Sequence, residues 1–287
     1  MSTRTAIEWT DSTWNPVRGC SRVSEGCRHC YAERVAARFS GPGQPYDGLA
    51  KLTPSGPRWT GKVELVEKHL LDPLRWKRPR RVFVNSMSDL FHEGLRDWSI
   101  AHIFAVAVAS VHLRGHVHQI LTKRSARMAT LLNSELFWES VNDEAGAIVM
   151  ERVDPHNRRS DDARATLKEY GPKTAPPGIW LGVSVEDQAA AVERIWPLLE
   201  TPAAVRFISA EPLLGPVDLE RLELLAPDGN RPGAWLNALT GHVAGPDDMG
   251  PKLDWVIVGG ESGHGARPMH PDWARSLRDQ CWAADVP

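Results

Sequence analysis

Residues 179–185 read Ile-Trp-Leu-Gly-Val-Ser-Val, a nearly continuous apolar run that ends directly before the acidic pair Glu186 and Asp187. A run of this length and β-branched content is typical of a strand buried on both faces of a parallel sheet. Four further runs have the same character: residues 82–85, 118–122, 205–209 and 255–258. Together these runs predict an α/β protein built on a parallel sheet.

Helical periodicity fills the segments between these runs. The predicted helices span residues 98–113, 125–132, 188–200 and 271–284. A first strand is expected over residues 13–17, followed by a helix over residues 31–39. Six strand–helix units in this order predict a right-handed parallel sheet or a partial barrel, in one domain over residues 1–287.

Two segments interrupt this alternation. Residues 133–178 are charged and end in a stretch rich in Pro and Gly, and residues 225–253 contain many Pro and Gly. Loops of this length in a compact domain are usually functional or mobile. Both segments are therefore expected to be insertions at the rim of the barrel.

The overall composition excludes several classes of protein. The 287 residues include 42% hydrophobic and 24% charged residues, which is typical of a globular chain. A net charge of −2 excludes a generally basic nucleic-acid coat. Residues 1–13 contain no apolar signal segment, and the longest apolar run, residues 100–113, is too short to span a bilayer. We therefore expect a soluble cytoplasmic protein without a membrane segment.

Cysteines give the first chemical signal. Cys20, Cys27 and Cys30 lie within eleven residues, whereas Cys281 stands alone. In a cytosolic protein, clustered thiols more often indicate metal or cluster ligation than disulfides. Three thiolates on a [4Fe–4S] cluster leave one iron open to a small molecule. A zinc site completed by a histidine such as His29, or a set of ordinary buried thiols, are the alternatives.

The residues around these cysteines resemble a known type of loop. Asn15-Pro16-Val17-Arg18-Gly19-Cys20, followed by Cys27-Arg28-His29-Cys30-Tyr31-Ala32-Glu33-Arg34, resembles the cluster loop of radical S-adenosylmethionine (SAM) enzymes, most closely the spore photoproduct lyase branch. The usual loop has three residues between its first two cysteines, whereas this one has six. The whole chain is also similar to a phage-associated three-Cys-motif family, through residues 7–10, 83–92, 121–124, 180–186, 209–215 and 258–263. That family usually continues into an apolar aromatic strand, so the C-terminus is expected to be trimmed.

The resemblance implies a (β/α)6-type partial TIM barrel that holds a [4Fe–4S] cluster on Cys20, Cys27 and Cys30. It implies that SAM binds the open iron and is cleaved reductively, releasing a 5′-deoxyadenosyl radical that abstracts a substrate hydrogen. A flavodoxin- or ferredoxin-like electron donor is the implied partner. Since the resembling lyase repairs DNA, the expected substrate is a nucleic-acid base or nucleotide. The alternative is a non-catalytic zinc- or cluster-bearing module that binds nucleic acid or a partner protein.

Polar residues follow every predicted strand, at the edge where parallel barrels gather their active sites. The expected SAM-binding residues are Ser86, Ser88, Asp89, Ser184, Glu186, Gly259, Gly260, Glu261 and Arg267. Those after the second strand are expected to accept from the SAM amino group, and those after the fourth to meet its carboxylate or ribose. The glycines permit close backbone approach, and Arg267 suits a carboxylate partner. For each residue the alternative is a side chain that simply faces water.

Two other features carry weaker signals. Cys281 lies in the last predicted helix and is expected to be a packed small residue, with a hydrogen-atom donor as the alternative. Residues 77–81 read Lys-Arg-Pro-Arg-Arg, a basic patch directly before the second strand. A solvated charge run is the expected role of this patch, with a phosphate contact as the alternative.

Overall fold

The computed structural model describes residues 5–152, 167–223, 235–243, 249–263 and 265–287. Six strands form one sheet in the order β1-β6-β7-β8-β9-β12, and every neighbouring pair is parallel. Their bounds are β1 Ser12–Trp14, β6 Arg81–Val84, β7 Val117–Thr122, β8 Ile179–Ser184, β9 Val205–Ala210 and β12 Trp255–Val258. The predicted α/β class and parallel sheet are confirmed.

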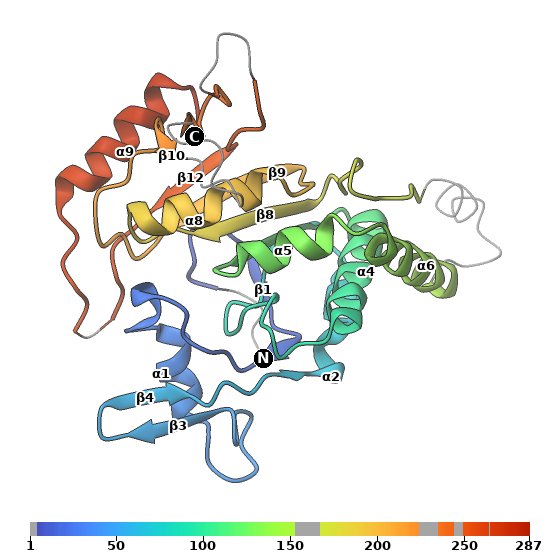
Figure 1. Cartoon of the computed structure of the whole chain (residues 1–287). Helices are drawn as coiled ribbons and strands as arrows, with labels where there is room; N and C mark the ends of the chain where they lie inside the picture. Colours follow the sequence, from blue (N-terminus) through green and yellow to red (C-terminus); the bar gives the residue numbers. More distant parts are fainter. Residues whose placement is uncertain (1–4, 153–166, 224–234, 244–248, 264) are drawn as a thin grey trace.

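Four helices follow strands of this sheet and lie against it (Figure 1): α4 Asp97–Arg114, α5 Ser125–Leu132, α8 Gln188–Leu199 and α9 Pro271–Ala283. Local sequence sets several of their ends. The Asp187 carboxylate accepts from the Ala190 N–H at 2.9 Å and so caps α8. Gly115, with φ of 69°, takes the left-handed conformation that ends α4. Pro271 occupies the first turn of α9, as the sequence predicts.

The first expected insertion, residues 133–178, is not a rim loop throughout. Its first part forms the helix α6 Glu135–Arg152, which packs along α4. The Phe104 ring of α4 meets Phe137 and Trp138 of α6 edge-on, with ring centroids 5.5 and 6.0 Å apart. The helix α4 is therefore covered on both sides, which explains why its apolar residues do not form a single stripe. Residues 153–166 lie outside the described residues.

The second expected insertion, residues 225–253, contributes to the core where it is described. The strand β11 Trp235–Leu236 pairs antiparallel with β10 Leu222–Glu223. Leu236 and Leu253 are fully buried, so this part of the segment is packed rather than peripheral. Residues 224–234 and 244–248 lie outside the described residues.

The predicted first strand, residues 13–17, is divided. After β1 the chain passes through Asn15 and Pro16 and then forms β2 Val17–Arg18, which pairs with β5 Glu64–Leu65. Pro16 has no N–H and cannot continue a ladder, which accounts for the break.

The small elements between β2 and β6 were not predicted from the sequence. They are the 3-10 turn η1 Glu25–Cys27, the hairpin β3 Ala50–Thr53 and β4 Gly56–Trp59, the strand β5, and the short helices α2 Glu67–Leu70 and α3 Asp72–Arg75. The predicted helix after the cysteines is present as α1 Tyr31–Arg38. In the described part of the chain no helix is long and apolar enough to cross a membrane.

Aromatic side chains fill the sheet face opposite the helices. The Trp9 ring lies 4.7 Å from Phe83 of β6 and 6.3 Å from both Phe207 of β9 and Trp255 of β12, between ring centroids. A Cβ atom at Gly182 would come within 2.6 Å of the Phe207 ring, so glycine is needed there. One tryptophan of the N-terminal segment thus contacts three strands of the sheet.

Candidate functional site

The cysteine loop, residues 19–30, lies across the carboxyl ends of the parallel strands. Gly19 forms a parallel bridge with Ser88, which follows β6. Further along, the Ser21 hydroxyl accepts a hydrogen bond of 2.8 Å from Nη2 of Arg124, which follows β7. The loop is thus tied to the segments after two neighbouring strands.

The same loop also reaches the segments after β8 and β12. Gly26 lies against Glu186, where an added Cβ atom would come within 3.1 Å of the carboxylate carbon. The Nδ1 atom of His29 lies 2.9 Å from a carboxylate oxygen of Glu261, which follows β12. Segments after four strands of the sheet therefore converge on one loop.

Two of the three thiols of this loop have a raised pKa. Burial raises the pKa of Cys20 to about 12, and charge on Cys27 or Cys30 acts in the same direction. Burial also raises the pKa of Cys30, with Cys27 again adding to the effect. Cys20 and Cys30 are consequently neutral as free thiols near pH 7.

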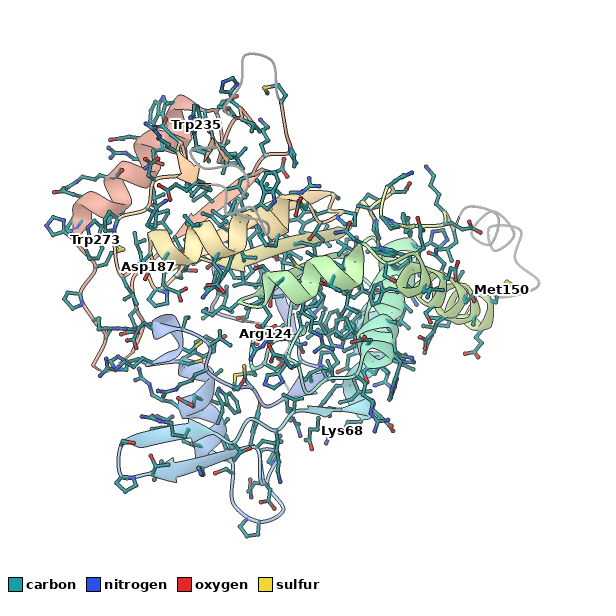
Figure 2. The ribbon with its side chains drawn as sticks, viewed as in Figure 1. Lys68, Arg124, Met150, Asp187, Trp235 and Trp273 are labelled. Carbon is teal, nitrogen blue, oxygen red and sulfur yellow. The ribbon has the colours of Figure 1, made fainter. Side chains whose placement is uncertain are left out.

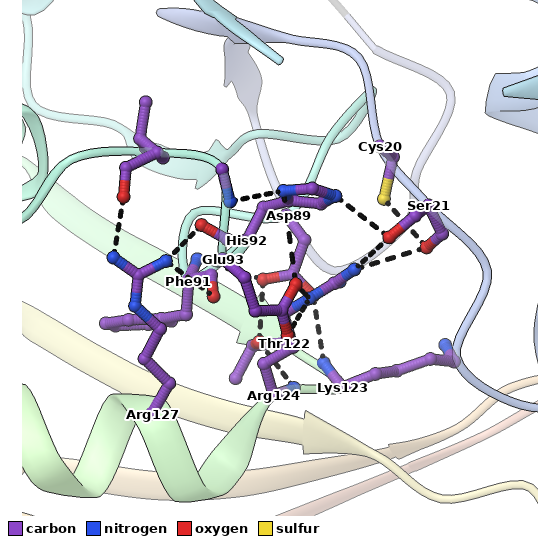
Figure 3. Close-up of polar contacts among 12 residues, drawn as sticks. Cys20, Ser21, Asp89, Phe91, His92, Glu93, Thr122, Lys123, Arg124 and Arg127 are labelled. Atoms are coloured by element: carbon purple, nitrogen blue, oxygen red, sulfur yellow. Dashed lines mark hydrogen bonds and ion pairs between the residues drawn. The ribbon is translucent and has the colours of Figure 1, made fainter. Parts of the chain in front are cut away.

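Asp89, which the sequence analysis expects to bind a ligand, is the centre of a buried network (Figure 3). One carboxylate oxygen accepts from the Thr122 hydroxyl at 2.7 Å and from the Phe91 N–H at 3.0 Å. The other accepts from the Lys123 N–H at 3.1 Å and from Nη1 of Arg124 at 3.0 Å. A carboxylate offers about four acceptor positions, so the protein itself fills them. The predicted ligand contact stays a prediction, and it requires one of these partners to be exchanged.

Arg124 connects this network to the cysteine loop. Its side chain lies near the centre of the molecule (Figure 2) and is 4% exposed. Besides Asp89 and Ser21, it contacts the Glu93 carboxylate, with Nε 2.9 Å from Oε2. Although burial acts the other way, the charge of Asp89 raises the pKa of Arg124. A permanently charged guanidinium therefore holds Ser21, the residue next to Cys20.

His92 gives Ser21 a second partner. The Gly94 N–H donates to Nδ1 of His92 at 3.0 Å, so in the neutral ring the proton is on Nε2. That Nε2 lies 2.9 Å from the Ser21 hydroxyl and donates to it. Burial, and next the charge of Arg124, lower the pKa of His92, which favours this neutral form.

Glu186 is paired within the protein. Its carboxylate receives two hydrogen bonds from Arg194 of α8, at 2.8 and 3.2 Å, and both side chains are 3% exposed. Burial alone would raise the pKa of Glu186, but the bonds and charge of Arg194 outweigh it and the pKa is lowered. Ser184 is buried at the end of β8, and its carbonyl accepts from the same guanidinium at 2.8 Å.

Glu261 and Arg267, both expected to contact a ligand, contact each other. Nη2 and Nε of Arg267 lie 2.5 and 3.1 Å from the two carboxylate oxygens of Glu261. Hydrogen bonding from Arg267 is the main reason that the pKa of Glu261 falls to about 2. Arg267 also donates to the Glu25 carbonyl of the cysteine loop at 3.0 Å. The pair therefore joins the segment after β12 to the cysteine loop.

The two serines after β6 contact the chain before the cysteines. The Ser86 hydroxyl donates to the Asn15 side-chain oxygen at 3.2 Å, and the Ser88 hydroxyl donates to the Val17 carbonyl at 3.0 Å. The Tyr31 hydroxyl donates to the Ser86 carbonyl at 2.5 Å. These contacts hold the segment after β6 against both ends of the cysteine loop.

A glycine is needed at residue 259 because the side chain of Glu211, which follows β9, lies against it. A Cβ atom at residue 259 would come within 2.2 Å of a carboxylate oxygen of Glu211. The other carboxylate oxygen of Glu211 accepts from the Ser209 hydroxyl at 3.0 Å. Gly260, next along the chain, is exposed. Gly259 thus makes room for the Glu211 carboxylate, and the ligand approach predicted for both glycines stays a prediction.

Lys123, like Arg124 and His92, was not among the residues predicted to form the site. It follows β7 directly and is half-buried, and its charge acts on both Cys30 and Glu186. In the part of the chain that the structure describes, its ammonium forms no ion pair, whereas Arg124, the next residue, and Arg194 of α8 are paired. The signal available in the sequence was its place at a strand end, which it shares with Asp89 and Glu186.

Two weaker signals lie away from this site. Cys281 is 7% exposed and belongs to the core, as expected. In the basic patch, Arg81 pairs with Asp11 at 3.1 Å and Arg80 donates to the Ser12 hydroxyl at 3.1 Å. The patch precedes β6, so it lies at the opposite edge of the sheet from the cysteine loop.

Among the described residues, no three His, Cys, Asp or Glu side chains surround a single point as the ligands of one metal ion would. A cluster makes a different demand, because each of three thiolates binds a different iron and the sulfurs lie farther apart. The cluster and the zinc alternative therefore both stay predictions. Three partly buried thiols in one short loop are a donor set that suits an iron–sulfur cluster.

Comparison with known proteins identifies the family. Residues 4–287 match the model of a family described as "Protein of unknown function (DUF5131)". The chain belongs to this family. No curated protein and no solved structure matches it. The match extends over the cysteine loop, all six strands of the parallel sheet and α9.

Proposed function

We propose that this protein is a radical SAM enzyme that holds a [4Fe–4S] cluster on Cys20, Cys27 and Cys30 and acts on a nucleic-acid base or nucleotide. The observation that carries the proposal is the position of the cysteine loop. It spans the carboxyl edge of a parallel sheet and contacts the segments after β6, β7, β8 and β12. That edge is where parallel α/β enzymes assemble their active sites.

A curved sheet supports the partial-barrel form of the fold. The strands follow one another in chain order, and three strands separate β6 from β12. In a flat sheet this corresponds to about 19 Å. Trp9 nevertheless lies within 4.7 Å of Phe83 on β6 and 6.3 Å of Trp255 on β12, between ring centroids. Such contacts favour a sheet that curls around Trp9.

The residues around the thiols suit the groups that SAM presents. Lys123 forms no ion pair in the described part of the chain, and its charge acts to lower the pKa of both Cys30 and Glu186. It therefore suits the SAM carboxylate better than Arg267, which Glu261 already holds. When bound, the cluster and SAM supply the electron and the hydrogen-abstracting radical. Arg124 and Asp89 act as positioning residues that hold the loop beside Cys20.

Anaerobic reconstitution with iron and sulfide tests the proposal directly. Wild-type protein is expected to take up about four irons per chain, as one [4Fe–4S] unit requires. The variants Cys20→Ala, Cys27→Ala and Cys30→Ala are each expected to lose the cluster. Cys281→Ala is the matched control and should keep it, because Cys281 is packed in the core.

A second measurement separates the enzyme from a non-catalytic module. Cluster-loaded protein reduced with dithionite should convert SAM to methionine and 5′-deoxyadenosine. Stoichiometric zinc without iron uptake, or a cluster that does not cleave SAM under reducing conditions, would refute the proposal in favour of the binding module.

A further inference from the structure

Residues 18–62 carry a charge that the rest of the chain does not share. We name this region the basic lobe. It contains eight Lys and Arg against three Asp and Glu, whereas the remaining residues contain 26 against 33. A local excess of +5 in a chain of net charge −2 indicates attraction to a polyanion at this place.

Part of this charge is not neutralised within the protein. Arg22 pairs with Glu33, which is 2% exposed, and that pair cancels. In the described part of the chain, five other cations of the lobe form no ion pair: Arg18, which lies over the Tyr46 ring, and Arg38, Lys51, Arg58 and Lys62. Arg38, Lys51 and Lys62 are exposed and Arg58 is half-exposed, so these four are accessible to a ligand.

The hairpin β3–β4 places two of these cations directly opposite each other. Lys51 of β3 is the register partner of Arg58 of β4, so both side chains lie on one face of the ribbon. Like charges directly opposite each other destabilise a strand pair. A two-stranded ribbon that keeps such a pair is well suited to bind an anionic group between the two side chains.

The basic lobe also carries exposed apolar side chains, which favour nucleic acid over an acidic polypeptide. Of the nine large hydrophobic residues that are exposed in the described chain, four lie in the basic lobe: Val23, Tyr31, Phe39 and Leu52. The half-buried rings of Tyr46 and Trp59 lie 6.3 Å apart, with Arg18 5.5 Å from the Tyr46 ring centroid. Basic grooves with accessible aromatic side chains are how proteins hold single strands, through phosphate contacts and base stacking.

The hairpin is fastened to the cysteine loop, so a strand held on it lies beside the thiols. The Trp59 N–H donates to Glu33 at 2.7 Å, and Glu33 also holds Arg22, two residues after Cys20. Figure 1 shows α1, β3 and β4 grouped together, away from the helices α4, α5 and α6. We infer that the basic lobe binds the backbone of a single-stranded nucleic acid and leads it to the cysteine loop. The further statement that this single strand is the substrate of the enzyme rests on the proposed function.

Fluorescence anisotropy with labelled DNA and RNA single strands of about 20 nucleotides tests this inference on the full chain. The double variant Lys51→Gln/Arg58→Gln is expected to bind roughly tenfold more weakly than wild type. The slope of log affinity against log salt should fall by about 1.4, since each lost contact to a single strand contributes about 0.7. Its thermal stability should not fall, because the change removes a repulsive pair.

Lys77→Gln/Arg78→Gln is the matched control, since it removes the same charge from exposed residues at the opposite edge of the sheet. It should leave affinity and slope unchanged. Equal loss in both double variants, no binding by wild type, or equally tight binding of polyglutamate would overturn the inference.

The measurement is made on iron-free and on cluster-loaded protein and uses no SAM, so the two proposals fail independently. If the protein loads its cluster and cleaves SAM but does not bind single-stranded nucleic acid, this inference alone would be overturned. Binding that depends on Lys51 and Arg58 in protein that takes up no iron would support it, while refuting the enzyme.

Discussion

Replacement of Asp89 by Asn separates three accounts of this residue. If Asp89 mainly binds a ligand, Asp89→Asn weakens ligand binding and leaves stability unchanged. If it only caps the turn after β6, Asn replaces it with little effect. The structure favours a third outcome, because the carboxylate accepts four hydrogen bonds and pairs with Arg124, whose side chain is 4% exposed.

The magnitude follows from the partners that Asn cannot keep. If the amide oxygen keeps Thr122 and Phe91, the amide NH2 faces two donors, the Lys123 N–H and Nη1 of Arg124. Removing one partner of a buried ion pair costs about 3–5 kcal/mol. Arg124 retains Glu93 and Ser21, so we expect the lower end, about 3 kcal/mol, which is a large part of a typical stability of about 5–15 kcal/mol.

Urea unfolding followed by tryptophan fluorescence at pH 7 provides the assay. An unchanged slope of unfolding free energy against urea concentration shows that the folded and unfolded states are the same in wild type and variant. Glu93→Gln is the matched control. Glu93 contacts the same guanidinium, but its carboxylate is 65% exposed, so its loss should cost at most about 1 kcal/mol. A difference of less than about 1 kcal/mol between the two variants would refute the reasoning. Weaker SAM binding at unchanged stability would return Asp89 to the ligand contacts.

Three further predictions follow from particular contacts. Gly182→Ala should destabilise the protein by about 1–3 kcal/mol in urea unfolding, because its Cβ would lie 2.6 Å from the Phe207 ring. The control is Gly146→Ala in α6, where the space around the residue is open, and this variant should be more stable by up to about 1 kcal/mol. Equal changes in stability in the two variants would contradict the packing argument. Burial lowers the pKa of His118 to about 3, so the unfolded chain binds its proton first and stability falls as the pH drops below about 6.5. Between pH 7 and pH 5 wild type should therefore lose about 2 kcal/mol more than His118→Gln, and parallel pH profiles would exclude His118 as the cause. Lys123→Gln should weaken SAM binding to cluster-loaded protein about tenfold or more while iron content stays the same, and unchanged affinity in a SAM titration would remove Lys123 from the site.

The sequence by itself determined the regular elements of the sheet and the place of the thiols. The helix α5 and the strand β12 have the predicted bounds, and the other five strands of the parallel sheet agree within a few residues. These features are local, because a buried strand needs a continuous apolar run and a helix needs its own periodicity and end residues. The three clustered cysteines are likewise visible in one short stretch.

Other parts of the fold had no local signal. The helix α6 was expected to be a loop, because charged residues separate its buried positions and only the packing of α4 shows which side they cover. The hairpin β3–β4 has strands of only four residues and lies against α1 rather than in the main sheet.

Tertiary structure alone decided how the polar residues at the strand ends are used. The sequence places Asp89, Glu186, Glu261 and Arg267 at one edge, but it does not show that Asp89 meets a guanidinium 35 residues away or that Glu261 meets Arg267. A buried charge needs a partner, and the nearest one depends on how the segments after separate strands come together. Paired in this way, Asp89, Glu261 and Arg267 help to hold the cysteine loop across the sheet, while Lys123 forms no ion pair in the described part of the chain.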